Sequence, residues 1–360
     1  SIPVKMDDGS VKVFTGYRSQ HNSTLGPYKG GIRYHWNVTV DEVKALSFWM
    51  SMKCSVVNNP LGGGKGGIIV NPKELSEGEL ERLSRGYVQR VWRNIGSDKD
   101  IPAPDVYTTP QIMGWMRDEY EKLVGHADPG VITGKTIEDG GSEVRGYATA
   151  QGGVYCLIEA SKKLDLKAEE TTVAVQGFGN AGSYMAKILS GIGFKIVAVT
   201  DSRGGALNMD GLDVEAVEKH KAETRSVSGA PGTEEINNDD ILRLGVDVLV
   251  PAALENVITA ENAADVQAKV IVELANGPTT PEADEVLHSN GVLVVPDILA
   301  NAGGVRVSCF EWQQNLAGEH WSEADVLKKL ETSMVEAFND VWAQKEKYAI
   351  DMRTAAFVSA

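Results

Sequence analysis

Five short runs rich in β-branched residues occupy the middle of this chain and restrict its possible folds more than any other feature. They lie at residues 172–176, 195–200, 246–251, 269–274 and 291–296. Runs of this length and composition are typical of parallel strands that are buried on both faces. Helical stretches such as residues 181–189 separate them. The sequence therefore predicts an α/β fold with a doubly wound, Rossmann-like sheet.

The N-terminal part combines short β-rich runs with signals for the start of helices. Thr39 and Ser76 each stand three residues before a glutamate, which is the pattern of a capping box. Thr109 precedes a proline at the first helical position. We expect three helices from these caps, the first ending near Lys53, and we expect the glycines to gather in loops. Ser322 carries a similar signal for a long amphipathic helix near the C-terminus.

The length of the chain sets the number of domains. A chain of 360 residues is too long for one ordinary hydrophobic core, so we expect two α/β domains. The Rossmann-like domain is predicted at residues 146–310. Residues 1–145 and 311–360 are expected to form the other domain, to which the C-terminal helices return.

Composition excludes several classes of partner. The formal net charge is −15, whereas nucleic-acid-binding domains present a basic face. No run of about 18 apolar residues, the length needed to span a membrane, is found. Three widely spaced cysteines have no metal-ligand spacing and are typical of reduced thiols. We therefore expect a cytoplasmic protein without a metal site and with neither a nucleic-acid nor a membrane partner.

A glycine fingerprint directly follows the run at 172–176 and opens a helical stretch, a context that predicts a dinucleotide site. Gly177 allows a tight turn, Gly179 lets the backbone approach the pyrophosphate, and Gly182 allows close packing of helix and strand. The helix N-terminus would offer free amide groups to the phosphates. The predicted cofactor-binding residues of this turn are Gly177, Phe178, Gly179, Asn180, Ala181 and Gly182. A flexible glycine loop without a ligand is the alternative.

The end of the next run, at 195–200, carries conflicting signals about the cofactor. Asp201 stands where an acidic residue commonly accepts the ribose 2′-hydroxyl of NAD. Ser202 and Arg203 follow it and could instead hold the 2′-phosphate of NADP. We expect NAD(P), with a preference for NADP and with use of NAD left open. A plain polar turn is the third interpretation.

Three lysines, Lys29, Lys53 and Lys65, lie close together in the sequence, and glycine flanks two of them. A single lysine is normally a solvated charge. Glycine beside lysine lets a ligand approach the backbone, and crowding in a cleft lowers the pKa of an amine. A lysine in that state can act on a carbonyl or on an attacking water near neutral pH. Asp105, in a Pro-Ala-Pro-Asp turn, would be held rigidly as a proton donor or acceptor.

The glycine-rich lysine segments do not match the phosphate loop of nucleotide hydrolases. That loop needs a glycine five positions before its Gly-Lys pair and a serine or threonine after it. Asn59 and Gly66 occupy these positions around Lys65, and Pro129 occupies the first of them before Lys135. The lysines therefore favour a dehydrogenase of a small acid over a nucleotide hydrolase.

Over essentially its whole length, the chain resembles the glutamate dehydrogenases within the glutamate/leucine/phenylalanine/valine dehydrogenase superfamily. The most specific motif is Leu-Gly-Gly-Gly-Lys-Gly-Gly-Ile-Ile-Val-Asn-Pro at residues 61–72. Residues 68–75 and 105–108 look closest to archaeal members. The resemblance implies a domain for substrate binding and assembly beside the dinucleotide domain.

The resemblance also implies roles for the charged residues. Lys65 would activate the water that attacks the imine, and Asp105 would carry protons to and from the amino group. Lys53 would pair with the α-carboxylate of the substrate. Lys29 and Ser308 would bind its distal carboxylate.

Four further residues match family positions near the substrate or the nicotinamide, namely Thr133, Thr149, Asn180 and Asn276. Of these, Thr133 is expected on the substrate side and the others on the cofactor side. As plain structural alternatives, Asn276 would be a turn former and Thr149 a helix cap.

The distal pair, Lys29 and Ser308, favours glutamate because relatives that use neutral amino acids carry apolar residues there. A buried lysine facing an apolar side chain would be a costly unpaired charge. The resemblance implies reversible oxidative deamination of L-glutamate to 2-oxoglutarate and ammonium by a homohexamer. The alternatives are a neutral amino-acid dehydrogenase, of the leucine or phenylalanine type, and a catalytically silent dinucleotide-binding regulatory subunit.

Overall fold

The computed structural model describes all residues from Ser1 to Ala360, which divide into two compact units. Unit 1 comprises Ser1–Arg145, Val305–Lys329 and Ala360, and unit 2 comprises Gly146–Gly304 and Leu330–Ser359. Two segments therefore differ from the predicted bounds: residues 305–310 join unit 1 rather than the Rossmann-like domain, and residues 330–359 join unit 2 rather than the first domain. Within residues 330–359, Arg353 pairs with Glu273, Asp284 and Asp297 of unit 2, and Asn339 Nδ2 donates to Glu159 Oε2 at 3.3 Å.

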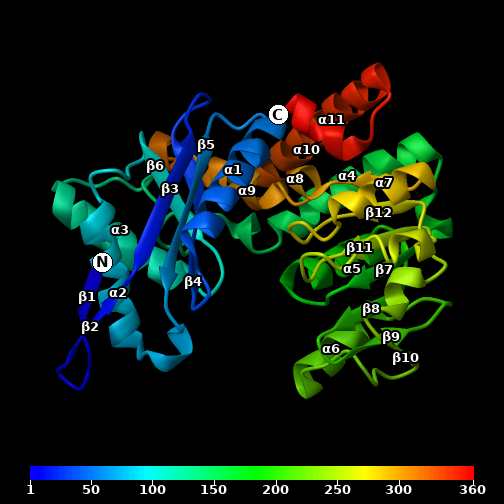
Figure 1. Cartoon of the computed structure of the whole chain (residues 1–360), viewed down its shortest axis with the longest axis horizontal. Coiled ribbons are helices and arrows are strands. Elements are labelled where there is room, and N and C mark those ends of the chain that lie inside the picture. The colour runs from blue at the N-terminus through cyan, green and yellow to red at the C-terminus, as the bar shows by residue number, and fades with distance from the viewer. The chain divides into compact units, whose positions relative to one another are not determined.

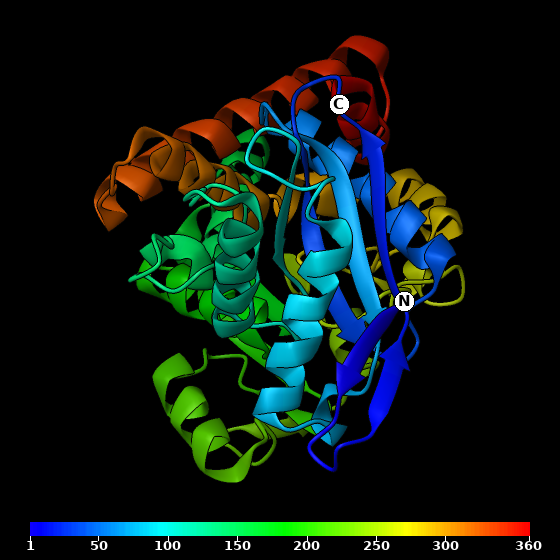
Figure 2. The same cartoon turned by 90° about the vertical axis from the view of Figure 1, so that its left-hand side faces the viewer.

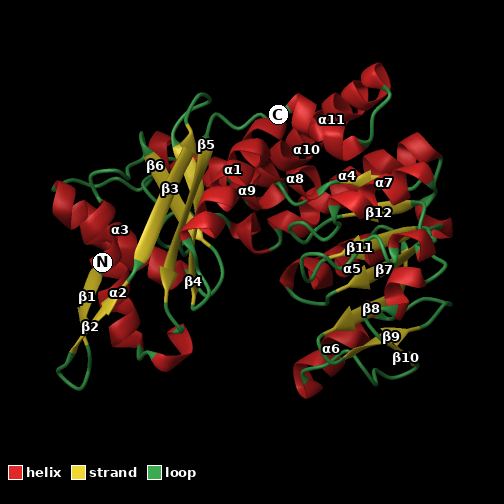
Figure 3. Ribbon diagram, viewed as in Figure 1, coloured by secondary structure: helices red, strands yellow, loops and turns green.

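Unit 1 is built on a four-stranded sheet with the order β3-β5-β4-β6 and a separate two-stranded ribbon of β1 and β2 (Figure 3). The strands are β1 (Ile2–Lys5), β2 (Val11–Phe14), β3 (Gly16–Asn22), β4 (Tyr28–His35), β5 (Gly62–Ile69) and β6 (Asp100–Pro104). β4 is parallel to both β5 and β6, whereas β3 runs antiparallel to β5.

Helices cover both faces of this sheet, with α1 on one face and α2 and α3 on the other (Figures 1 and 2). They are α1 (Val40–Val56), α2 (Glu77–Val91), α3 (Pro110–Val124) and α9 (Gly303–Ala317), with short 3-10 turns η1 (Pro72–Glu74) and η2 (Glu143–Gly146). The predicted caps are confirmed, since Thr39 and Ser76 form capping boxes and the Thr109 side chain accepts a hydrogen bond from the Ile112 N–H.

The expectation that glycines gather in loops is wrong for β4 and β5. A Cβ atom on Gly30 would lie 1.5 Å from the Gly64 carbonyl oxygen, and one on Gly63 would lie 2.1 Å from Ser51 Oγ of α1. These glycines therefore let β5 approach both β4 and α1 more closely than side chains would permit.

Unit 2 contains a seven-stranded sheet with the order β10-β9-β8-β7-β11-β12-β13. The strands are β7 (Thr172–Gln176), β8 (Lys195–Asp201), β9 (Gly204–Leu207), β10 (Glu234–Ile236), β11 (Val248–Pro251), β12 (Val270–Val272) and β13 (Leu293–Val295). The five predicted strands are confirmed as a parallel set. β9 and β10 extend it with antiparallel pairs that the sequence did not predict.

The other elements of unit 2 surround this sheet. They are α4 (Ala148–Leu164), η3 (Ala168–Glu170), α5 (Asn180–Gly191), α6 (Val214–Thr224), η4 (Asp240–Arg243), η5 (Ala263–Asp265), α7 (Pro281–Ser289), α8 (Asp297–Ala300), α10 (Glu323–Tyr348) and α11 (Met352–Ser359). α10 is the long helix predicted after Ser322, and it crosses the division between the units at residue 329. None of the helices combines the length and the apolar character of a membrane span.

The three cysteines are free and buried. Cys54 and Cys309 share a small apolar cluster with Leu61 and Ile101 in unit 1. Burial raises the pKa of the Cys54 thiol to about 12 and that of Cys309 to about 11.

Candidate active site

The predicted lysines of the central strands lie on one face of the unit 1 sheet. Lys29 on β4 is in parallel register with Gly63 on β5, and Gly63 faces α1. Lys65 is two residues further along β5, so its side chain leaves the same face. Lys53 lies in the last turn of α1, which packs on this face, and is half-buried. The sheet thus directs the side chains of Lys29 and Lys65 toward α1.

Lys65 and Asp105 form a direct ion pair, with Lys65 Nζ 2.6 Å from Asp105 Oδ2. Asp105 follows the end of β6 and also receives Arg33 Nε at 3.2 Å on the same oxygen. Burial would raise the pKa of the Asp105 carboxyl, but the charges of Lys65 and Arg33 outweigh this and hold the pKa below its usual range. The arrangement supplies a carboxylate that can accept a proton beside an ammonium that can donate one.

Lys29 is the most buried of the three predicted lysines, with 1% of its surface exposed. Its Nζ donates to Thr133 Oγ1 at 2.7 Å, and the hydroxyls of Thr133 and Ser308 lie 2.6 Å apart. Its other acceptors are the carbonyl oxygens of Ile101 and Pro102, at 3.3 and 3.5 Å. No carboxylate pairs with it, and burial lowers the pKa of Lys29 to about 7. An anionic group of a ligand would complete this site.

Two arginines of unit 1 were missed in the sequence analysis. Arg33 is four residues after Lys29 on the same strand, so strand alternation alone would have placed it on the same face. Arg145 has a buried Nε without a hydrogen-bond partner. Burial lowers the pKa of Arg145, while the negative charges of Glu311 and Asp105 oppose the shift. No sequence motif marks Arg145.

The glycine fingerprint of unit 2 adopts the geometry of a dinucleotide turn between β7 and α5. Gly177 has a φ of +97°, which other residues rarely adopt. A Cβ on Gly182 would lie 1.8 Å from the Gly177 carbonyl oxygen, so only glycine permits this close packing. A Cβ on Gly179 would meet no atom within 4 Å, which leaves room for a ligand beside the backbone.

The position of this turn in the sheet also suits a nucleotide. β7 lies between β8 and β11, where the strand order reverses. Ligands of open α/β sheets bind at the carboxyl ends of the strands at this switch point. Phe178 is buried in the turn, and its carbonyl oxygen accepts a hydrogen bond from Lys221 Nζ at 2.6 Å. Asn180 and Ala181 form the first positions of α5.

Asp201 ends β8 and is bonded into its own turn. Its Oδ1 accepts the Arg203 N–H at 2.9 Å, its Oδ2 accepts the Val227 N–H at 2.9 Å, and Lys221 Nζ lies 3.5 Å away. Burial would raise the pKa of Asp201, but these backbone donors and Lys221 lower it. Ser202 and Arg203 are exposed, and the Arg203 guanidinium donates only to the Thr224 carbonyl oxygen at 3.3 Å. An acid and two cations therefore stand together here.

The remaining two cofactor-side residues lie elsewhere in unit 2. Thr149 is in the first turn of α4, where Tyr147 is the N-cap residue, so Thr149 is not the cap. Asn276 is exposed in a turn, and its Oδ1 accepts a hydrogen bond from Asn301 Nδ2 at 3.1 Å. Asp297 also accepts the Gly277 N–H at 2.9 Å, so this turn is firmly held.

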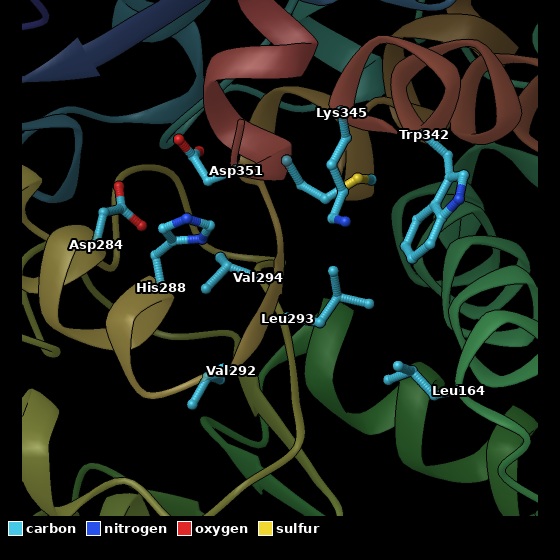
Figure 4. Close-up of a pocket in the computed structure, with 11 residues that line it drawn as sticks. Leu164, Asp284, His288, Val292, Leu293, Val294, Trp342, Lys345 and Asp351 are labelled. Carbon is cyan, nitrogen blue, oxygen red and sulfur yellow. The ribbon is translucent and has the colours of Figure 1, made fainter. Parts of the chain in front are cut away.

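A separate pocket of about 220 Å³ lies in unit 2. Figure 4 shows Asp284 and His288 of α7 together with Trp342 and Lys345 of α10 around it. None of the residues predicted for catalysis or for substrate or cofactor binding lines this pocket.

Comparison with known proteins identifies similar chains over the full length. The sequence profile described as "Glutamate/Leucine/Phenylalanine/Valine dehydrogenase" matches residues 140–360, and that of the "Glu/Leu/Phe/Val dehydrogenase, dimerisation domain" matches residues 1–122. A glutamate dehydrogenase of Thermotoga maritima is 55% identical over 360 residues, which are 100% of this chain and 86% of the relative. A catabolic NAD-specific glutamate dehydrogenase of Bacillus subtilis is 52% identical (99% and 84% covered), and an NADP-specific one of Synechocystis is 50% identical (100% and 86%).

Solved structures show the same fold. A hetero-hexameric glutamate dehydrogenase from Thermus thermophilus matches with a TM-score of 0.93 at 38% identity, covering 99% of this chain and 85% of that one. The enzyme from Peptoniphilus asaccharolyticus matches with a TM-score of 0.89 at 46% identity, covering 99% and 87%. These relatives are bacterial, so they give no support to a closer resemblance to archaeal members.

Proposed function

The chain belongs to the glutamate/leucine/phenylalanine/valine dehydrogenase family, and we propose that it catalyses the NAD(P)-dependent, reversible oxidative deamination of L-glutamate to 2-oxoglutarate and ammonium. The observation that carries this proposal is the buried Lys29 ammonium, which has Thr133 and Ser308 beside it but no anion. A distal carboxylate of the substrate supplies that missing negative charge.

The proton chemistry falls to the Lys65–Asp105 pair. Loss of a hydride from the substrate Cα to bound NAD(P)⁺ would convert the amino acid into an imine. Lys65 polarises the water that attacks this imine, and Asp105 takes up and returns the protons of the amino group. Lys53 pairs with the α-carboxylate. Its place in the last turn of α1, a helix that packs on the sheet face from which Lys29 and Lys65 project, supports this role.

The choice of substrate rests on Lys29. With leucine or phenylalanine in the site, its ammonium would stay buried without an anionic partner, which is costly. A neutral amino-acid dehydrogenase is therefore the weaker alternative. A catalytically silent regulatory subunit would not need the partly buried Lys65–Asp105 pair, so the presence of this pair disfavours that alternative.

Unit 2 is the proposed dinucleotide domain, with contacts from the turn at Gly177–Gly182 and from Thr149 and Asn276. We infer that NADP is preferred and that NAD is also used. The exposed Arg203 and the half-buried Lys221 beside Asp201 support binding of a 2′-phosphate, while Asp201 supports binding of a ribose hydroxyl. Relatives of both specificities are similar to this chain.

Unit 1 is the proposed domain for substrate binding and assembly into a homohexamer. Its surface exposes several large apolar side chains that a second copy would cover, among them Val11, Val13, Trp36 and Ile69. The match of residues 1–122 to a dimerisation domain supports this assignment.

The test is a substrate panel followed by the absorbance of the reduced nicotinamide. We expect rapid oxidation of NADPH and NADH with 2-oxoglutarate and ammonium, and much slower oxidation with the 2-oxo acids of leucine and phenylalanine. Faster turnover of the neutral 2-oxo acids would favour the neutral amino-acid enzyme. Cofactor binding without any turnover would favour the silent subunit.

A further inference from the structure

Unit 1 contains a completely buried ion pair that the proposed chemistry does not use. Lys135 Nζ lies 2.9 Å from Glu311 Oε1, and neither side chain is exposed to solvent. Lys135 belongs to the loop that contains Thr133, and Glu311 belongs to α9. The free-energy cost of removing two charges from water offsets most of their mutual attraction, so such a pair contributes little to the stability of the fold. Its geometry is therefore of more interest than its energy.

The pair fastens the loop to the helix through backbone groups on both sides of Thr133. Glu311 accepts the Gly134 N–H on Oε2 at 2.8 Å and the Lys135 N–H on Oε1 at 3.4 Å. Lys135 Nζ donates to the Ile132 carbonyl oxygen at 2.6 Å and to Asn315 Oδ1 at 2.7 Å. The peptide units that flank Thr133 thus have fixed partners.

The same helix also carries Ser308, one turn before Glu311, and residues three apart lie on the same side of a helix. Attachment of the loop to Glu311 therefore brings Thr133 next to Ser308, and the hydroxyl oxygens of these two residues are 2.6 Å apart. Thr133 in turn receives the Lys29 ammonium at 2.7 Å. Of the three groups proposed to face a distal carboxylate, Thr133 and Ser308 are therefore held together by the Lys135–Glu311 pair, which we call the clamp.

We propose that Lys135 and Glu311 are positioning residues that set the geometry of the distal-carboxylate pocket and thereby the preference for a dicarboxylic amino acid. This inference rests on the proposed glutamate dehydrogenase function. Without the clamp, Thr133 and Ser308 lose their fixed separation, and the hydrogen bonds offered to the carboxylate weaken. The reacting end of the substrate, at Lys65 and Asp105, keeps its own contacts.

The test compares glutamate with norvaline, which has an uncharged side chain of similar length. The variant K135M/E311M replaces both charges with apolar groups of similar length, so that no lone charge remains buried. We expect its KM for glutamate to rise at least about tenfold, while its kcat and its KM for norvaline change less than about threefold. A control variant, K187M/E218M, removes an exposed ion pair of unit 2 and should change neither substrate.

A second double variant, K135Q/E311Q, also leaves no lone charge buried and keeps a side-chain oxygen at position 311 that can accept the Gly134 N–H, and it serves if K135M/E311M does not fold. We expect the same selective rise in KM for glutamate, of smaller size. A parallel loss with both substrates, or no change in selectivity, would overturn the positioning role. An inactive wild-type protein would instead refute the proposed function, so the two failures are distinguishable.

Discussion

The titration of Lys29 predicts how the preference for glutamate depends on pH. Burial lowers the pKa of this lysine to about 7, and only its protonated form attracts a carboxylate. Because the folded pKa lies below the ordinary value for lysine, the ammonium form is complete below about pH 6 and is lost as the pH rises through about 7. Above that pH, Lys29 must therefore take up a proton when the distal carboxylate binds.

The magnitude follows from the fraction of protonated Lys29. This fraction falls about tenfold for each pH unit above about 7, which makes roughly a hundredfold between about pH 6 and about pH 9. The value of kcat/KM for glutamate should carry this factor, because kcat/KM reports the ionisation of the free enzyme. Norvaline has no distal carboxylate, so its kcat/KM should not depend on the protonation of Lys29.

The assay is the ratio of kcat/KM for glutamate to that for norvaline across this pH range. Proton transfers at the amino group and at Asp105 affect both substrates and cancel in the ratio. We expect the ratio to fall with rising pH in the wild type and to be low and independent of pH in Lys29→Met. A wild-type ratio that does not change with pH would refute the reasoning.

Three further predictions concern the proton pair and the dinucleotide turn. Lys65→Ala and Asp105→Asn should each lower kcat by about a thousandfold while the Kd for NAD(P), measured by fluorescence titration, stays within about twofold, and near wild-type turnover would contradict their roles. Arg33→Gln removes one of the cations that hold the pKa of Asp105 low, so the acidic limb of the kcat/KM profile should move to higher pH, and an unmoved limb would count against this electrostatic effect. Gly182→Ala places a methyl group against the Gly177 carbonyl oxygen. It should raise the Kd for NAD(P) at least about tenfold and lower the free energy of unfolding by about 1–3 kcal/mol. The control Gly191→Ala, whose Cβ would have no atom within 4 Å, should change neither quantity.

Local sequence signals correctly predicted the structural features that depend on residues a few positions apart in the chain. The capping boxes at Thr39 and Ser76 act over three residues, and the fingerprint after β7 acts over six, so both could be read directly. The antiparallel β9 and β10 were missed because short strands at a sheet edge lack the continuous apolar character of central ones.

Contacts between distant parts of the chain could not be predicted in the same way. Lys135 and Glu311 are 176 residues apart, and their meeting depends on the return of α9 to unit 1. The amphipathic pattern of α10 showed that one face is buried, but it did not show which unit covers that face. The glycines of β4 and β5 resembled loop residues because their purpose, close approach of strands and helix, appears only in three dimensions.

The buried cysteines make the native protein resistant to alkylation. With the pKa of Cys54 and Cys309 raised to about 12 and about 11, almost no reactive thiolate is present at neutral pH, and reagent has no access to the sulfur. Each thiol therefore labels only when its surroundings open. The labelling rates of Cys54 and Cys309 would measure local opening near the proposed substrate pocket. The labelling rate of Cys156 in α4 would measure opening of unit 2 separately.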